Sequence, residues 1–178
     1  CSSRRIGRWG ERMASWIAGV VGVVAVVAYL IGATPTGYLA GRLLRGIDLR
    51  EHGSGSTGAT NVLRTLGAWP ALGVLLADVL KGAAAIVFAG GFLSWASTWA
   101  PDEFDAQAWT PWAVSLAGLA ALLGHSRPVW LGFAGGKSVA AGLGVLLAMA
   151  WPVGVGGLAA FGVAVAVFRI VSLGSILA

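Results

Sequence analysis

The stretch ASWIAGVVGVVAVVAYLIGAT, residues 14–34, decides the fold class of this chain. It holds no charged side chain, and residues 20–27 are all valine apart from one glycine and one alanine. A helix of about 20 apolar residues is long enough to cross the hydrocarbon core of a bilayer. We therefore expect a membrane-spanning helix here. Thr34-Pro35-Thr36-Gly37 should break or kink it, with helix resuming over about 38–45.

The rest of the chain repeats this pattern. Of the 178 residues, 57% are hydrophobic and only 11% are charged, whereas soluble domains carry roughly a quarter of their residues as charged ones. The mean hydropathy is +0.83. We predict an all-α integral membrane protein, a polytopic bundle of about five to seven membrane helices with short re-entrant or interfacial polar loops. Besides the first span, the apolar stretches predict spans at about 69–95 and 111–124. Within 138–168 we expect two shorter helices, joined by a tight hairpin at Trp151-Pro152 and the glycines at 154, 156 and 157.

Charge and cysteine content exclude several classes of function. The net charge of +5 fits basic residues collected in cytoplasmic loops of a membrane protein. No basic patch with interleaved aromatic residues is present, so nucleic acid is not an expected partner. Cys1 is the single cysteine and the two histidines lie far apart in the sequence. We therefore expect neither a disulfide within the chain nor a metal site.

Two polar segments interrupt the apolar chain. The first island, HGSGSTGATNVLRTLG, covers residues 52–67, and the second island, GHSRPVWLGFAGGKS, covers residues 124–138. Glycines at 53, 55 and 58 let backbone N–H groups turn toward an anion, and Arg64 offers a planar guanidinium suited to phosphate. Both islands suit a phosphorylated substrate. The alternative is an ordinary glycine- and serine-rich loop.

The second island also excludes a nucleotide-hydrolysing site. GFAGGKS is one residue short of the phosphate-binding G-x-x-x-x-G-K-[ST] motif, and no βαβ pattern surrounds it. The glycine N–H groups and the ammonium of Lys137 beside a helix start still suit a phosphate group.

Three further side chains carry open alternatives. His125 is either a general base or a hydrogen-bonding group at a helix end. Asp78 and Lys81, at i and i+3 within the span 69–95, can pair on one helix face. The pair should face the bundle interior, either as a functional group or as a structural ion pair.

Basic residues set the predicted orientation. The two islands and their approach carry Arg42, Arg45, Arg50, Arg64, Arg127 and Lys137, whereas the loop at 99–110 carries only acidic charges between tryptophans. The islands are therefore expected to be cytoplasmic and the acidic loop external. This places the N-terminus outside, where its four arginines do not belong. We therefore expect residues 1–12 to be a non-native or over-extended segment, and Met13 to be the start.

GSGSTGATNVLRTLG (53–67), GHSRPVWLGFAGGKS (124–138) and SLGS (172–175) resemble, in order and topology, the bacterial acyl-phosphate:glycerol-3-phosphate acyltransferases of the PlsY type. The resemblance implies transfer of a fatty acyl group from acyl phosphate to the 1-hydroxyl of glycerol 3-phosphate. The products are lysophosphatidate and phosphate, with no cofactor, no metal and no dedicated protein base. Membrane lipid is the remaining partner, and the membrane is a bacterial inner membrane.

The resemblance also assigns roles to residues. It implies that four catalytic residues hold glycerol 3-phosphate: Ser54, Arg64, Lys137 and Ser175. It implies a cradle for the acyl phosphate made of Thr60, Asn61, Gly135 and Gly136. The other substrate-binding candidates in the three segments are Gly55, Ser56, Gly58, His125, Ser138 and Ser172.

Residues 13–178 are expected to form one membrane-embedded acyltransferase domain, truncated at its C-terminus relative to the family. The alternative function is a transporter or channel for a phosphorylated solute, because basic groups at membrane depth also mark ion paths. A transporter of this kind should show inverted repeats, and none is found. Acyl-chain preference and oligomeric state stay open.

Overall fold

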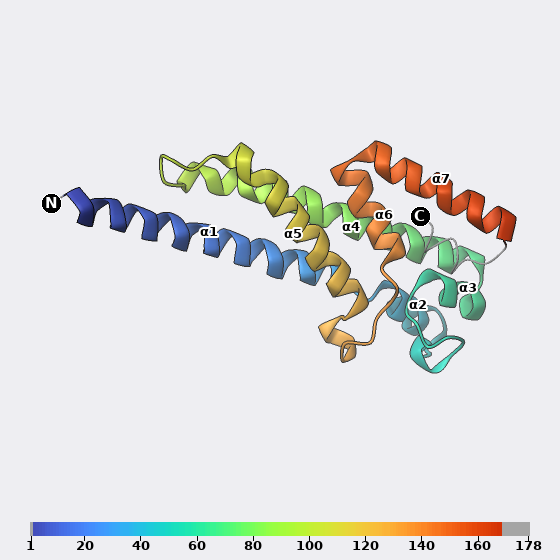
Figure 1. Cartoon of the computed structure of the whole chain (residues 1–178). Coiled ribbons are helices and arrows are strands. Elements are labelled where there is room, and N and C mark those ends of the chain that lie inside the picture. Colours follow the sequence, from blue (N-terminus) through green and yellow to red (C-terminus); the bar gives the residue numbers. More distant parts are fainter. Residues whose placement is uncertain (1, 169–178) are drawn as a thin grey trace.

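The structure is a computed structural model that describes residues 2–168, and within this range it is entirely helical. Five helices lie along one another and form the bundle: α1 (Ser2–Ala33), α4 (Ala68–Ala96), α5 (Ala106–Ser126), α6 (Val139–Met149) and α7 (Trp151–Phe168). The short elements are α2 (Thr36–Arg45), α3 (Ala59–Leu66) and three 3₁₀ turns, η1 (Leu49–Glu51), η2 (Ser97–Trp99) and η3 (Val129–Leu131). In Figure 1, α2, α3 and the loops around them gather at one end of the bundle, away from the N-terminus.

The predicted spans correspond to helices with small shifts of their ends. The break expected at Thr34-Pro35 separates α1 from α2, and the span predicted at 69–95 is α4. Helix α1 begins earlier than predicted and continues through residues 2–12. Helix α5 also begins earlier, at Ala106, because the side chain of Asp105 caps it by accepting hydrogen bonds from the N–H groups of Gln107 and Ala108. Pro111 lies inside this helix rather than at its start.

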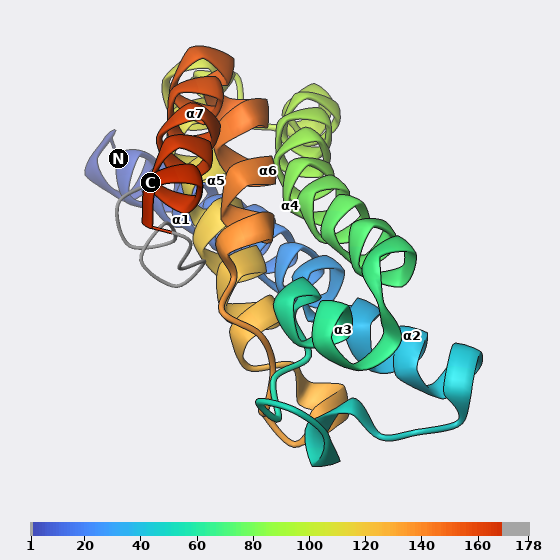
Figure 2. The same cartoon turned by 90° about the vertical axis from the view of Figure 1, so that its right-hand side faces the viewer.

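The apolar stretch 138–168 forms two helices, as predicted, with the break at Ala150. The glycines at 154, 156 and 157, which we expected in the connection, lie instead within α7. Proline is tolerated in the first turn of a helix, because the N–H it lacks has no partner there. Trp151-Pro152 therefore starts α7, and Ala150 alone connects α6 with α7. Helix α6 packs between α4 and α7 (Figure 2).

Glycines set the two closest helix crossings of the bundle. A Cβ at Gly32 of α1 would lie 2.0 Å from the carbonyl oxygen of Ala121 in α5. A Cβ at Gly144 of α6 would lie 1.9 Å from the carbonyl oxygen of Val79 in α4. The backbones of these helix pairs therefore touch. Small residues allow such close approach between membrane helices, where packing rather than the hydrophobic effect holds helices together.

The outer surface of the bundle is apolar. Leu80, Val87 and Leu119 are among the large side chains that are 63–70% exposed. By length and composition, the helical stretches Gly10–Arg45 and Ala68–Trp99 could cross a membrane, and Val139–Met149 and Trp151–Val167 are shorter apolar helices. Such a surface is suited to lipid rather than to water.

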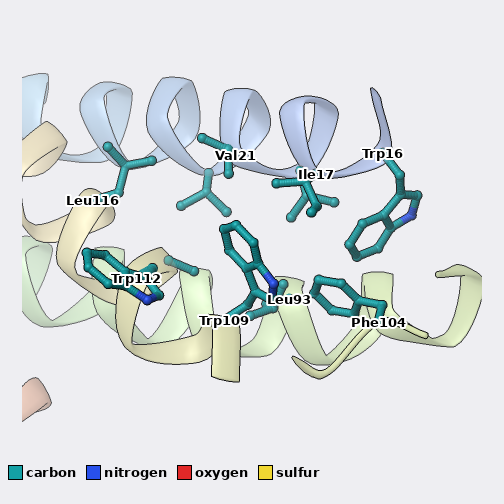
Figure 3. A pocket seen from close by; sticks show the side chains of 11 residues that line it. Trp16, Ile17, Val21, Leu93, Phe104, Trp109, Trp112 and Leu116 are labelled. Atoms are coloured by element: carbon teal, nitrogen blue, oxygen red, sulfur yellow. The ribbon is translucent and has the colours of Figure 1, made fainter. Parts of the chain in front are cut away.

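An apolar cavity of about 400 Å³ lies between α1, α4 and α5, in the half of the bundle that contains the acidic loop. Figure 3 shows Trp16, Trp109 and Phe104 directed toward one another across it. The ring centroids of Trp16 and Phe104 are 4.4 Å apart. The cavity is lined by the early part of α1 and the first turns of α5, so it lies away from the two islands.

Candidate active site

Asn61 organises the first island. Its side chain is 1% exposed, and Oδ1 accepts a hydrogen bond from the backbone N–H of Ser54 at 2.9 Å. Nδ2 lies 2.8–3.1 Å from three carbonyl oxygens of the loop, those of Leu49, His52 and Ser56. Gly53 has φ +60°, and a Cβ there would lie 2.2 Å from Asn61 Oδ1. The amide of Asn61 therefore fixes the shape of the loop, and its polar atoms are occupied by the protein itself.

The anion-binding nest expected from the glycines does not form at three of the loop amides. The N–H of Ser54 donates to Asn61, that of Gly55 to the carbonyl of His52, and that of Gly58 to Ser56 Oγ. The N–H groups of Ala59 and Thr60, by contrast, have no acceptor among the described residues. They begin α3, and such free N–H groups at a helix start favour an anion. The start of α3 is thus the part of the first island whose N–H groups are open to an anion.

The polar candidates of the first island are exposed near this helix start. Thr60 and Arg64 are four residues apart, so they share one face of α3, and both are exposed. Ser54 is exposed as well. Within residues 2–168, the guanidinium of Arg64 makes no hydrogen bond and no ion pair. It is therefore a permanent positive charge available to a ligand.

The second island packs onto the C-terminal end of α5. The N–H of Gly136 donates to the carbonyl of His125 at 3.1 Å. Ser138 Oγ donates to the carbonyl of Leu122 at 2.9 Å and is hydrogen-bonded to Ser126 Oγ. Lys137, between these two anchored residues, is exposed and makes no ion pair or side-chain hydrogen bond within the described range. The island thus holds a free ammonium on a fixed backbone.

Arg50, just before the first island, connects this segment of the chain with the second island. Its guanidinium forms a two-pronged contact with Asp48, with Nε 3.0 Å from Oδ1 and Nη2 2.7 Å from Oδ2. Its third nitrogen, Nη1, donates to the carbonyl of Leu131 in the second island at 3.3 Å. The guanidinium carbons of Arg42 and Arg50 each lie 5.4 Å from the centroid of the Tyr38 ring. We call Tyr38, Arg42, Asp48 and Arg50 the arginine clamp.

The arginine clamp was not predicted from the sequence. Tyr38 and Arg42 share one face of α2, but Asp48 and Arg50 lie beyond the end of that helix, so no single helical or strand period relates the four residues. A signal was present in the spacing of Asp48 and Arg50. A carboxylate two residues before an arginine, next to the start of a short helix, can accept both the backbone N–H and the guanidinium, as Asp48 does here.

The clamp predicts an acid-sensitive stability. The hydrogen bonds from Arg50 lower the pKa of Asp48 to about 2. Because this pKa lies below the unfolded value, the ionised carboxylate stabilises the fold above about pH 4, and this contribution is lost as the pH falls toward 2. Wild type should exceed Asp48→Asn in thermal stability at pH 6 in detergent, and the difference should shrink steadily from pH 4 to pH 2. A constant difference over that range would contradict the assignment.

A second polar cluster lies inside the bundle, between α2, α4 and α5. Lys81 Nζ is 2.9 Å from Asp78 Oδ1, so the predicted i, i+3 contact forms, and both side chains are buried. The same Lys81 Nζ donates to the carbonyl of Thr34 at 2.8 Å, and Thr36 Oγ1 donates to Asp78 Oδ1 at 2.5 Å. His125 is also buried, with Nδ1 3.6 Å from Asp78 Oδ1. We call Thr36, Asp78, Lys81 and His125 the buried cluster.

The remaining sequence candidates are placed as follows. Gly55, Ser56 and Gly58 belong to the loop that Asn61 organises, and Gly135 packs against the carbonyl of His125. Ser172 and Ser175 lie outside the described residues. The described part of the chain contains no group of three or more His, Cys, Asp or Glu side chains that could hold a metal ion.

Comparison with known proteins identifies relatives of most of the chain. The sequence profile of the family described as "Glycerol-3-phosphate acyltransferase" matches residues 22–178. A protein of Rhizobium johnstonii named "Glycerol-3-phosphate acyltransferase 2" is 68% identical over 145 residues, which cover 79% of this chain and 65% of that protein. A glycerol-3-phosphate acyltransferase of Trichormus variabilis is 54% identical over 167 residues, covering 93% of this chain and 74% of the relative. The chain thus spans about two thirds to three quarters of the length of these relatives.

The fold is similar to two crystal structures of PlsY (YgiH), described as an integral membrane glycerol 3-phosphate acyltransferase. The glycerol 3-phosphate form superposes with a TM-score of 0.74 at 34% identity, and the lysophosphatidic acid form with a TM-score of 0.68 at 32% identity. Each match covers 88% of this chain and 70% of the solved chain.

Proposed function

The chain belongs to the glycerol-3-phosphate acyltransferase family and has the fold of an integral membrane protein, and from this premise we propose that it transfers a fatty acyl group from acyl phosphate to the 1-hydroxyl of glycerol 3-phosphate. The products are lysophosphatidate and inorganic phosphate. One observation carries the assignment to this chain's own residues. The arginine clamp, in α2 and the segment that leads into the first island, binds the second island. Each island presents an exposed cation, Arg64 and Lys137, without a partner among residues 2–168.

The proposed chemistry relies on positioning and charge. Arg64 and Lys137 bind the phosphate of glycerol 3-phosphate, and the N–H groups at the start of α3 bring partial positive charge to the acyl phosphate. The 1-hydroxyl oxygen bonds to the acyl carbon while the bond from that carbon to the phosphate oxygen breaks. The departing phosphate takes the hydroxyl proton, so no protein base is needed. Fixed cations at the leaving phosphate stabilise the charge that develops there.

The position of His125 supports this base-free scheme. Its ring is buried, and a Cβ on Gly136 would lie 2.3 Å from its Nε2. The second island therefore covers the nitrogen that would act as a base. A general base needs to lie within hydrogen-bonding reach of the hydroxyl, and His125 is separated from the exposed surface by the backbone of Gly136.

We further propose that the islands face the cytoplasm and that the membrane is a bacterial inner membrane. The exposed arginines and lysine at the island end, and the acidic loop at the opposite end, support this orientation. Glycerol 3-phosphate then reaches Arg64 and Lys137 from water, and the acyl chain of the donor remains in the bilayer.

A donor-exchange assay tests the proposed function. The protein, expressed from its full reading frame and purified in detergent, is incubated with glycerol 3-phosphate and either palmitoyl phosphate or palmitoyl-CoA. We expect lysophosphatidate from palmitoyl phosphate alone, together with one inorganic phosphate for each product molecule. Product from palmitoyl-CoA alone would contradict the proposed donor. If neither donor gives product while the protein is folded, the acyltransferase assignment fails, and uptake of glycerol 3-phosphate into liposomes becomes the next measurement.

A further inference from the structure

The buried cluster lies where three helices meet. Asp78 Oδ1 accepts from Thr36 of α2 and from Lys81 of α4, and it faces His125 of α5. Asp78 is 1% exposed, so its carboxylate is held by these neighbours rather than by water. Ionisable groups inside a membrane helix bundle are costly and usually have partners or a function. One carboxylate oxygen thus contacts α2 and α4, which flank the first island, and α5, which leads into the second island.

His125 contacts the second island at its other side. A Cβ on Gly136 would lie 2.3 Å from His125 Nε2, and a Cβ on Gly135 would lie 2.2 Å from the His125 carbonyl oxygen. The same carbonyl accepts the N–H of Gly136. The two glycines thus pack directly against His125, and a residue with a Cβ at either position would clash with it. The position of the next residue, Lys137, follows from the position of the His125 ring.

The Nδ1 atom of His125 is buried and has no hydrogen-bond partner among the described residues. Asp78 Oδ1 lies 3.6 Å from it. A buried polar atom without a partner is uncommon and calls for an explanation. The ring is set between a carboxylate on one side and a glycine backbone on the other, which leaves it little freedom to turn.

We propose that Asp78 is a positioning residue that acts through His125: it fixes the imidazole, and the imidazole fixes the Gly135–Gly136 backbone and thereby the place of Lys137. The inference rests on the proposed function, because its consequence is the affinity of Lys137 for glycerol 3-phosphate. Neither Asp78 nor His125 touches substrate. The family resemblance implies that Gly136 holds the acyl phosphate, but its N–H already donates to the His125 carbonyl. Their removal should therefore weaken the binding of the substrate held by Lys137 without equally affecting the acyl donor.

Two polar replacements of His125 separate its two contacts. In glutamine the amide nitrogen falls near the place of Nε2, and in asparagine it falls near the place of Nδ1. We expect His125→Asn and His125→Ala to raise the KM for glycerol 3-phosphate about tenfold or more, as expected when a charged contact is misplaced. His125→Gln should raise it clearly less. The KM for palmitoyl phosphate should stay within about twofold of wild type in all three variants.

A matched control and a coupling test complete the design. Leu123→Ala lies two residues away on α5 with an outward-facing side chain and should leave both KM values unchanged. The double variant Asp78→Asn/Lys81→Met removes both buried charges together, so no unpaired ion is left behind. Its effect on the KM for glycerol 3-phosphate should not add to that of His125→Ala in the triple variant, because residues that act as one unit are non-additive.

Several results would overturn the inference. The first is an unchanged KM for glycerol 3-phosphate in His125→Asn and His125→Ala. The second is an equal rise of the KM for glycerol 3-phosphate and for palmitoyl phosphate in these variants, together with a lower melting temperature. The third is a KM for glycerol 3-phosphate in the triple variant that shows the full sum of the effects of His125→Ala and Asp78→Asn/Lys81→Met. If His125→Ala does not fold, the comparison of asparagine with glutamine decides alone. If wild type makes no lysophosphatidate, the proposed function fails and this inference fails with it. If wild type is active and the variants do not behave as described, only the inference fails.

Discussion

Replacement of Arg64 or Lys137 by alanine is expected to lower kcat/KM for glycerol 3-phosphate by about 100- to 1,000-fold, the loss typical of removing one group that stabilises transition-state charge. Both side chains are exposed at the island end, and within the described residues neither holds any other part of the protein in place. The loss should therefore appear in activity and not in folding. The measurement is initial-rate kinetics of lysophosphatidate formation, with melting temperatures recorded for each variant.

Conservative and control variants sharpen this prediction. Arg64→Lys keeps the charge but loses the planar guanidinium, so it should recover only part of the activity if the contact with phosphate is two-pronged. Arg45→Ala removes one positive charge from the end of α2, where Arg45 Nη1 donates to the carbonyl of Thr65. It should cost far less than Arg64→Ala. If Arg45→Ala and Arg64→Ala lower the rate equally, a general loss of positive surface charge explains both, and Arg64 has no specific role.

Gly32→Ala is expected to be the most destabilising of the single-methyl changes on α1. The added Cβ would lie 2.0 Å from the carbonyl oxygen of Ala121. The atoms that this Cβ would meet are backbone atoms of Ala121, so no side chain can rotate away. Helices α1 and α5 would therefore have to separate. Overpacking typically costs 1–3 kcal/mol when side chains can adjust. We therefore expect about 3 kcal/mol or more, which for a chain of this size lowers the melting temperature by roughly 10 °C.

Gly22 provides a matched control on the same helix. A Cβ at Gly22 would meet nothing within 4 Å, and alanine is the better helix former. Gly22→Ala should therefore leave the melting temperature unchanged or raise it slightly. Equal destabilisation by both substitutions would contradict the close crossing of α1 and α5. Gly144→Ala, at the crossing of α6 with α4, should behave like Gly32→Ala.

Much of the fold was predictable because a helix that crosses a bilayer needs about 20 apolar residues in a row. The apolar stretch after Gly67, in which Asp78 and Lys81 are the only charged residues, predicts α4 to within one residue at each end. The start of α5 was missed by five residues, because the prediction began at Pro111 and overlooked Asp105 as a cap. The glycines after Pro152 were assigned to a turn, although they lie within α7, where Gly154 packs closely against Leu147 of α6. Helix existence follows from hydropathy, but helix ends depend on caps.

The candidate site was less predictable. Exposed groups such as Arg64 and Lys137 stand out in an apolar sequence, and the resemblance to a family gave them roles that remain proposals. The structural work of Asn61 and of the arginine clamp depends on atoms of several segments meeting in space. No periodic pattern carries that information. The loop glycines illustrate the difference: composition correctly marked a special backbone, but its N–H groups bind the loop itself.

The break between α1 and α2 also restricts how this protein can move. On one side of Pro35, the carbonyl of Thr34 binds the ammonium of Lys81, and on the other side Thr36 binds Asp78. Both partners belong to α4, so the break is tied to α4 and is not a free hinge. Helix α3 is joined to α4 by Gly67 alone and packs against it, so α2, the first island and α4 should move as one body. Arg64 should therefore keep its place when glycerol 3-phosphate arrives from water, because the island that carries it cannot swing away from α4.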